Sequence, residues 1–322
     1  MLSRVAGSLF WMARYSERTA ANANIIRIQL TNMLEESGYD IPYLEDWKVI
    51  LNICGSSNEF LHKYNRLSVR NLSDYLLYSK ENLNSIINTT SNVRENARIT
   101  RDIIPHALWE EWNELYLSIK DYQHTNKFSL LEANKVLEKV NHTFLTSAGI
   151  INTLMSRDES YHFFKIGRWI ERAEKTTIIL NELLQKQKHE VRNCSATFSL
   201  QLTQTIEDYS KKHRICNTEH VLKYLLSDVT CTHSITYCIQ HIKQSLSIIE
   251  QNNVNGRIYP LLQEIQALQQ ATEVDHAHLT NEQQKSLLQD LLKRCIAIGS
   301  VFSNVYYLDV AYANLEVSSE FR

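Results

Sequence analysis

The sequence contains few residues that interrupt helices. Seven of its 322 residues are glycine and three are proline, which is far below average usage. Segments with apolar residues every three or four positions are common instead, and this spacing is typical of amphipathic helices. We therefore predict an all-α fold, a compact helical bundle. No linker separates independent parts, so we expect a single domain over residues 1–322.

Strong charge and long apolar runs are also absent. The formal net charge is −2, without a basic domain, and this argues against nucleic-acid binding. No apolar run approaches the roughly 20 residues that span a bilayer. The apolar stretch Val5 to Ala13 is followed at once by Arg14, so we do not expect a signal peptide. The six cysteines form no Cys-x-x-Cys pair, and such scattered thiols are typical of a cytoplasmic protein.

Motifs that mark common enzymes and cofactor sites are missing as well. There is no Gly-rich phosphate loop and no Gly-x-Ser-x-Gly elbow. Three Glu-x-x-His triplets occur, and di-metal bundles use this spacing. The triplets do not, however, lie at the offset of the internal repeat that is described below. They are Glu59/His62, Glu159/His162 and Glu273/His276. We predict neither a metal nor a cofactor.

One motif is present twice. The segment SLFWMARYSERTAANAN at residues 8–24 is echoed by YHFFKIGRWIERAEK at residues 161–175. Each copy contains Arg-x-x-Glu-Arg in a helix-forming run. At an offset of 154 residues, the matched pairs are Phe10 with Phe164, Arg14 with Arg168, Glu17 with Glu171, and Arg18 with Arg172.

A second match follows in the same order. Tyr75 to Leu77 is repeated at Tyr224 to Leu226, and Ser85 at Ser234, both at an offset of 149 residues. One small insertion or deletion explains the difference between the two offsets. We predict two tandem pseudo-repeats of roughly 150 residues, about 1–155 and about 156–322, which bury faces against each other.

Two interpretations fit the repeated motif. Residues three and four apart share one face of a helix, so each copy forms a charged patch. In the first interpretation the patches form a buried ion-pair network that fixes the register of two crossing helices. In the second, Glu17 and Glu171 meet in one polar cavity. Its cations would be Arg14, Arg18, Arg168 and Arg172.

Such a cavity allows two kinds of chemistry. Arginine grips a carboxylate or a phosphate bidentately. Two close carboxylates, here Glu17 and Glu171, share a proton or hold a divalent cation.

A second candidate binding site lies at residues 95–102, ENARITRD. Its members are Asn96, Arg98 and Arg101, and the two arginines share a helix face. The equivalent positions of the second pseudo-repeat carry no cation; they are Ser245, Ser247 and Glu250. This difference favours an asymmetric site, and a solvated helix face is the alternative.

The sequence resembles a known family in four segments that are spread over most of the chain, in the family's order. The segments are MLSRVAGSLFWMARYSERTAANA at the N-terminus, ENARITRDIIPHALWEEWNELY at 95–116, FFKIGRWIERAEKT at 163–176 and YLLSDVTCTHSITYCI at 224–239. They are similar to the bacterial Alpha-E proteins, an all-helical family. Where the family usually has Ala-Glu, this chain has Thr19-Ala20, so the carboxylate that Glu174 supplies in the second copy is lost from the first.

The resemblance implies a setting rather than a reaction. Alpha-E proteins are typically encoded beside, or fused to, a circularly permuted ATP-grasp protein and a transglutaminase-like protein, a neighbourhood associated with peptide synthesis or modification. Our first hypothesis is therefore a non-catalytic partner or substrate-binding subunit that presents a carboxylate-bearing peptide to an ATP-grasp ligase, with the motif arginines as clamps. The alternative is an enzyme that uses Glu17 and Glu171 as an acid/base pair or as ligands of a divalent metal.

Overall fold

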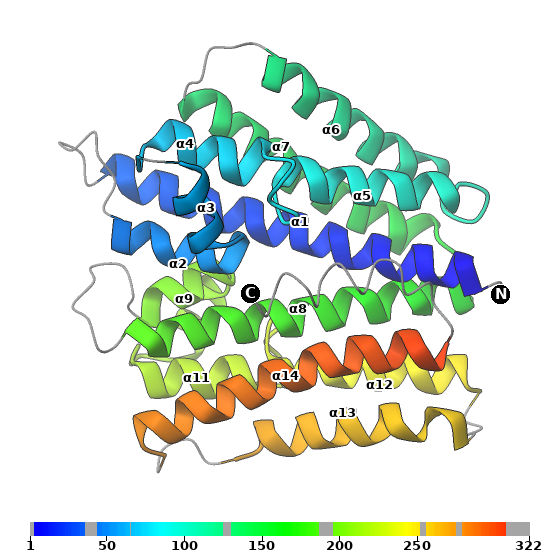
Figure 1. Ribbon diagram of the computed structural model, residues 1–322. Helices are drawn as coiled ribbons and strands as arrows, with labels where there is room; N and C mark the ends of the chain where they lie inside the picture. The colour runs from blue at the N-terminus through cyan, green and yellow to red at the C-terminus, as the bar shows by residue number, and fades with distance from the viewer. Residues whose placement is uncertain are drawn as a thin grey trace. The chain divides into compact units, whose positions relative to one another are not determined.

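The computed structural model describes residues 3–35, 44–64, 66–124, 130–186, 196–251, 256–274 and 279–306 (Figure 1). All regular secondary structure in these ranges is helical, with fourteen α-helices, one π-helix and one 3-10 helix. The prediction of an all-α protein is confirmed. None of the helices in the described ranges is long and apolar enough to cross a membrane.

The helices follow one another with short connections. In chain order they are α1 (Ser3–Glu35), α2 (Leu44–Cys54), α3 (Ser57–Lys63), α4 (Val69–Ser73), η1 (Asp74–Tyr78), α5 (Ile86–Ile99), α6 (His106–His124), α7 (Leu130–Leu154), α8 (Glu159–Lys186), α9 (Ala196–Leu202), α10 (Ile206–Lys212), α11 (Thr218–Ser227), α12 (Ile235–Ile249), η2 (Gly256–Ile258), α13 (Tyr259–Thr272) and α14 (Asn281–Val305). The sequence pattern predicts a last helix from about Glu282 to Leu315, and Leu315 lies outside the described residues.

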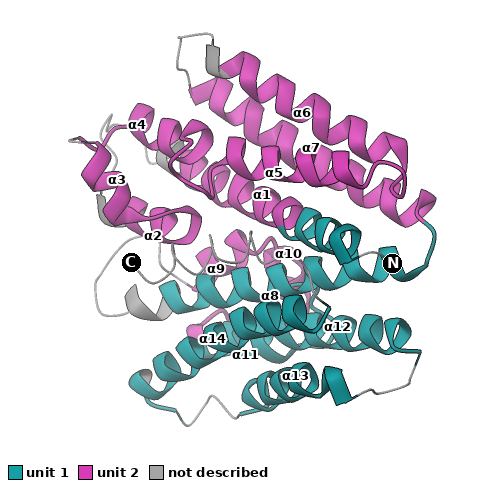
Figure 2. Cartoon of the chain, turned by 45° about the vertical axis from the view of Figure 1, so that its right-hand side comes forward, with its two compact units in different colours: residues 1–14, 156–184, 219–322 teal, residues 15–155, 185–218 magenta. Residues whose placement is uncertain are grey.

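The chain forms two compact units, each assembled from separate stretches of sequence (Figure 2). Unit 1 contains residues 1–14, 156–184 and 219–322, and unit 2 contains residues 15–155 and 185–218. Helix α1 contributes to both units, because the boundary falls inside the first Arg-x-x-Glu-Arg motif. These bounds differ from those of the predicted pseudo-repeats, and the duplication stays a prediction.

The core of unit 1 joins α1, α8 and α14 through aromatic rings. Phe10 on α1 stacks on Phe302 of α14, with ring centroids 4.9 Å apart. Phe163 on α8 also contacts Phe302, at 5.7 Å between centroids. All three side chains are buried, and removing rings of this size from water supplies much of the stabilisation of the fold.

The core of unit 2 is built from α1 to α7. Trp47 on α2, Phe60 on α3 and Trp112 on α6 are almost completely buried. The turn around the π-helix η1 is fixed by hydrogen bonds: the Tyr75 hydroxyl donates to the Ser56 carbonyl oxygen (3.2 Å), and Asn82 Nδ2 donates to the Tyr75 carbonyl oxygen (3.2 Å). Both bonds involve Tyr75, so they tie the start of α3 and the segment after η1 to the same residue.

Two of the helix boundaries show how far local pattern predicts structure. The sequence predicts Ser85 as the cap of a helix that follows it, and its Oγ accepts a hydrogen bond from the Asn88 N–H at the start of α5. The sequence pattern predicts one helix over residues 198–209, and this prediction is wrong, because α9 ends at Leu202 and α10 begins at Ile206. Gln204 between them has a φ of 55°, a left-handed conformation that ends an α-helix.

Candidate functional site

Buried charge is concentrated in the two copies of the motif. Among the side chains that the structure describes, every fully buried Lys, Arg, Asp or Glu lies at residues 14–18 or 171–175. The set is Arg14, Glu17, Arg18, Glu171, Arg172, Glu174 and Lys175. A buried charge is tolerated only with partners that replace water, so these positions require specific contacts.

Arg14 is held between two carboxylates of unit 1. Its Nε donates to Glu171 Oε2 and its Nη2 to Glu174 Oε2, each over 2.8 Å. The two acids are three residues apart on α8 and therefore share a face, which matches the fork of the guanidinium group. The side chains of Arg14, Glu171 and Glu174 are only 5%, 2% and 5% exposed. This is an ion-pair cluster shielded from water.

Helix α14 closes one side of this ion-pair cluster. A Cβ atom placed on Gly299 would lie 3.0 Å from Arg14 Nη1, so the helix backbone approaches the guanidinium directly. One turn away, Cys295 lies with its Sγ 3.8 Å from Thr177 Oγ1. Burial raises the pKa of the Cys295 thiol to about 12. The thiol therefore stays protonated and is not a nucleophile at neutral pH.

The second arginine of the α8 motif holds a loop in unit 1. Arg172 Nη1 donates to the Thr232 carbonyl oxygen over 3.3 Å, and Thr176 Oγ1 donates to the His233 carbonyl oxygen over 3.0 Å. The next residue, Ser234, caps α12 by accepting from the Tyr237 N–H. Both donors lie on one face of α8 and fix the start of α12.

Unit 2 contains a similar arrangement. Arg18 Nη1 donates to Asn84 Oδ1 over 3.2 Å, and Asn22 Nδ2 donates to the Asn84 carbonyl oxygen over 2.9 Å. The residue after Asn84 is Ser85, the cap of α5. Asn22 and Thr176 are 154 residues apart, and Asn84 and His233 are 149 apart, the same offsets as in the sequence matches. Sequence reasoning missed these loop anchors.

Arg168, the fourth motif arginine, is half-buried beside an aromatic group in unit 1. Its Cζ lies 5.6 Å from the ring centroid of Trp169, and Arg172 Cζ lies 4.8 Å from the same ring. His241 stacks on Trp169 at 4.8 Å between centroids. Burial, together with the charges of Lys165 and Arg172, lowers the pKa of His241, so the stacked imidazole is neutral at pH 7.

Glu17 and Glu171, the expected acid pair, are both buried. Glu17 belongs to unit 2 and Glu171 to unit 1. Their meeting in one cavity stays a prediction. What the structure assigns to Glu171 is the ion pair with Arg14.

Two of the three Glu-x-x-His triplets lie wholly within the described ranges. No group of three or more His, Cys, Asp or Glu side chains there could hold a metal ion. Glu59 Oε2 instead accepts a hydrogen bond of 3.2 Å from the Tyr75 hydroxyl. His162 is buried, and this burial lowers its pKa. His276 lies outside the described residues.

The structure separates the members of the second predicted site. Asn96 is buried, and its Nδ2 donates to the Asn92 carbonyl oxygen one turn earlier on α5, over 2.8 Å. Arg98 and Arg101 are exposed. The two arginines therefore remain surface groups, whereas Asn96 contributes to the packing of unit 2.

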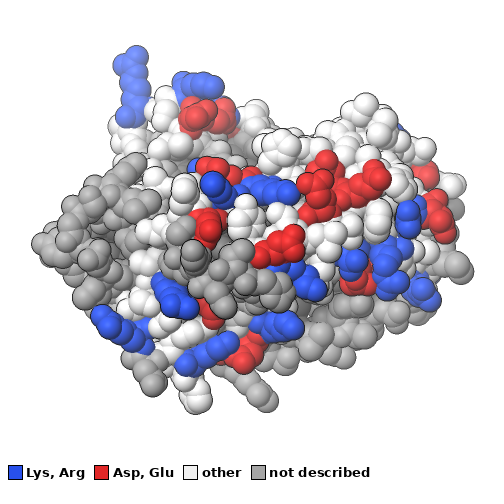
Figure 3. Space-filling model, turned by 90° about the horizontal axis from the view of Figure 1, so that it is seen from above, with Lys and Arg blue, Asp and Glu red and all other residues white. Residues whose placement is uncertain are grey.

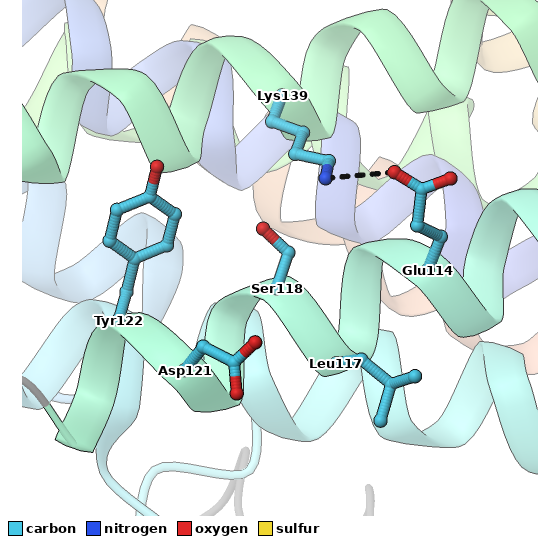
Figure 4. A pocket seen from close by; sticks show the side chains of 6 residues that line it. All are labelled: Glu114, Leu117, Ser118, Asp121, Tyr122 and Lys139. Atoms are coloured by element: carbon cyan, nitrogen blue, oxygen red, sulfur yellow. Dashed lines mark hydrogen bonds and ion pairs between the residues drawn. The ribbon is translucent and has the colours of Figure 1, made fainter.

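An open groove of about 460 Å³ lies between α6 and α7 of unit 2. Figure 4 shows its lining residues, with Lys139 Nζ on α7 paired to Glu114 Oε1 on α6 over 3.1 Å. The others are Leu117, Ser118, Asp121 and Tyr122. No motif in the sequence marks this groove. On the face of the molecule seen in Figure 3, cationic and anionic side chains are interspersed rather than gathered into a surface of one sign.

Fold and site together define a class: an all-helical protein whose buried charge belongs to two helices with Glu-Arg motifs. A family described as "a predicted alpha-helical domain with a conserved ER motif" matches residues 1–307. The chain belongs to this family, Alpha-E, and the resemblance seen in the sequence is confirmed. The comparisons with curated proteins and with solved structures found no match.

Proposed function

We propose that this chain is a cytoplasmic, non-catalytic helical subunit of a bacterial system for peptide synthesis or modification. Its partners would be a circularly permuted ATP-grasp ligase and a transglutaminase-like protein. The role would be to bind a carboxylate-bearing peptide and present it to the ligase. Membership of the Alpha-E family, with the genomic setting that the resemblance implies, supports these partners.

The ion-pair cluster around Arg14 is the observation that carries the non-catalytic role. A general acid or base must come within hydrogen-bond reach of the substrate. Glu171 is 2% exposed and already accepts a hydrogen bond from Arg14. Opening this pair would leave charges buried without compensation, at a cost of several kcal/mol. A cluster of this kind is suited to fixing the positions of α1 and α8.

The buried motif arginines accordingly hold the fold together rather than the peptide. Arg14 engages two carboxylates, while Arg18 and Arg172 anchor the loops before α5 and α12. The peptide would then be gripped by cations at the surface. The paired loop anchors, at matching offsets, also support the proposal that the chain arose by tandem duplication.

Reconstitution tests the proposed function directly. The chain and the ATP-grasp protein encoded nearest to it are purified, and complex formation is measured by size-exclusion chromatography with light scattering. ADP release by the ligase is then followed with peptide, with and without the chain. We expect a complex, faster ADP release in its presence, and no turnover by the chain alone.

Two results would contradict the proposal. Conversion of a peptide by the chain alone, abolished in Glu17→Gln or Glu171→Gln, would establish the enzymatic alternative. Absence of any complex with the ligase would remove the proposed partner.

A further inference from the structure

A row of arginines and aromatic rings lies along α5 and α6 of unit 2, and we call it the arginine edge. It comprises Arg94 and Arg98 on α5, Arg101 in the turn that follows, and Trp109 and Tyr116 on α6. Arg94 Cζ lies 5.0 Å from the Tyr116 ring centroid, and Arg101 Cζ lies 4.3 Å from the Trp109 ring centroid. Each end of the row is thus an arginine placed against an aromatic face.

Arg101 is oriented by a chain of hydrogen bonds. Its Nη2 lies 3.0 Å from His106 Nε2. Because a guanidinium group only donates, His106 Nε2 must accept and Nδ1 carries the proton. The Nδ1–H in turn donates a hydrogen bond to Glu110 Oε1, over 3.2 Å. The carboxylate, the imidazole and the indole face together hold the guanidinium group in one position.

Arg98 is oriented by one carboxylate and otherwise faces solvent. Its Nε pairs with Glu95 Oε2 over 2.9 Å, and its side chain is 62% exposed. Within the described part of the chain, this is the only ion pair of Arg98, and the bond to His106 is the only hydrogen bond of Arg101. Most of their N–H donors are therefore available to a ligand.

Apolar groups complete this surface. Ile99 and Ile103, which are close to the two arginines in the sequence, are partly exposed. Residues 94–102 carry three arginines against Glu95 and Asp102, and Glu110 on α6 adds a third acid beside His106. The surface therefore offers a ligand exposed guanidinium donors rather than a net positive charge. A guanidinium group grips a carboxylate bidentately, and the isoleucines suit apolar neighbours of such a carboxylate.

The fold itself does not need cations at these positions. In the second pseudo-repeat the equivalents of Arg98 and Arg101 are Ser247 and Glu250. Glu250 Oε1 accepts a hydrogen bond of 2.6 Å from the hydroxyl of Tyr306, the residue that follows α14. In unit 1, therefore, the position that matches Arg101 is an acid, Glu250, bonded within the fold. The arginine edge of unit 2 is instead turned to solvent.

We infer that Arg98 and Arg101 of the arginine edge bind an acidic peptide segment, one in which carboxylate side chains alternate with apolar residues. This inference rests on the proposed function and names the surface that would grip the peptide. Arg94 and Trp109 mark the two ends of this surface. Glu95 orients the guanidinium group of Arg98, and His106 orients that of Arg101, and these two groups contact the peptide.

Fluorescence anisotropy tests this assignment. The probe is a fluorescein-labelled hexapeptide of alternating glutamate and leucine, and its glutamine counterpart is the neutral control. We expect the Arg98→Gln, Arg101→Gln double variant to weaken binding of the acidic peptide at least about tenfold, the loss of one charge-assisted interaction. The matched control is Arg66→Gln, Arg70→Gln, which removes the same charge from exposed positions of unit 2 and should leave affinity unchanged.

Several results would overturn the inference. They are equal affinity of the double variant and wild type, equal binding of the neutral peptide, and tighter binding of a dT oligonucleotide of similar charge. Because both arginines are at the surface, we expect each variant to fold, and circular dichroism checks this. The double variant should still form the complex with the ATP-grasp protein. Loss of peptide binding with an intact complex therefore separates this inference from the proposed function.

Discussion

Gly167 on α8 lies directly against the backbone of Phe10 on α1. A Cβ atom built on Gly167 would lie 2.3 Å from the Phe10 carbonyl oxygen, far inside van der Waals contact. The two helices can approach this closely only because residue 167 has no side chain. Arg14 follows Phe10 by one helical turn, so the same approach brings its guanidinium group to the carboxylates of α8.

Substitution of Gly167 by alanine should therefore destabilise unit 1. The added methyl group meets a backbone oxygen, which cannot rotate away as a side chain would. We expect Gly167→Ala to lower the free energy of unfolding by about 1–3 kcal/mol, the usual range for an overpacked core. Urea unfolding followed by circular dichroism measures the change.

Gly149 on α7 provides the control for this substitution. A Cβ atom there meets no atom within 4 Å, so only helix propensity changes. We expect Gly149→Ala to raise stability by up to about 1 kcal/mol. If both alanine variants changed stability in the same direction, the close approach of α1 and α8 would not be what requires a glycine at residue 167.

Removal of the Arg14 guanidinium should be more costly than either glycine change. Arg14→Met leaves Glu171 and Glu174 buried without their shared partner. We expect a loss of about 3–5 kcal/mol, as for other broken buried ion pairs, measured by urea unfolding. Combining Arg14→Met with Glu171→Gln and Glu174→Gln removes the unbalanced charge as well, so the triple variant should be more stable than the single one. A triple variant less stable than Arg14→Met would mean that the two carboxylates have further stabilising partners.

The sequence predicts the buried charges of this protein but not their pairing. The repeated Arg-x-x-Glu-Arg pattern in apolar helices identifies Arg14 and Glu171 as special, because buried charges need partners. The spacing within α1 alone would equally place Arg14 beside Glu17, since both residues share one face. Only the packing of α8 against α1 assigns Glu171 and Glu174 to Arg14.

Other features leave no readable trace in the sequence. The anchors of Asn22 to Asn84 and of Thr176 to His233 use single polar residues and backbone carbonyls, which no spacing rule marks. The helix break at Gln204 occurs without glycine or proline. This break is closed by a local bond, from the Thr205 N–H to the Leu200 carbonyl oxygen over 2.8 Å, the 6→1 bond of a Schellman motif. The caps at Ser85 and Ser234 are local as well. They are readable in the sequence because serine is usual at an N-cap, whereas glutamine is unusual at the left-handed position that ends a helix.

Alkaline pH should unfold the protein through tyrosines that are buried or half-buried. Burial is the main cause that raises the pKa of Tyr75 and of Tyr306, and it raises the pKa of Tyr78 to about 12. A raised pKa means that the folded state binds the phenol proton more tightly than the unfolded state does. The resulting stability is complete below about pH 10, where unfolded tyrosine titrates, and is lost as the pH rises toward 12.

Absorbance at 295 nm and urea unfolding between pH 9 and 12 measure this dependence. We expect Tyr78→Phe to move the loss of stability to higher pH. Tyr259→Phe is the control, because its ring is exposed, and it should leave the profile unchanged. Simultaneous titration of all tyrosines near pH 10 in the folded protein would contradict the assignment.

The loop anchors predict a localised effect of Thr176. Its hydroxyl donates to the His233 carbonyl oxygen across unit 1, whereas the hydroxyl of the neighbouring Thr177 donates within its own helix, to the Ala173 carbonyl oxygen. Thr176→Val should cost about 1 kcal/mol, the net value of one hydrogen bond, and should speed amide hydrogen exchange at residues 231–238, where α12 begins. Thr177→Val should leave exchange there unchanged.

Because Asn22 makes the equivalent bond to Asn84, Asn22→Ala should speed exchange at residues 82–89. Faster exchange at both segments in either variant would mean that the loops open together, and that each anchor does not act on its own helix alone.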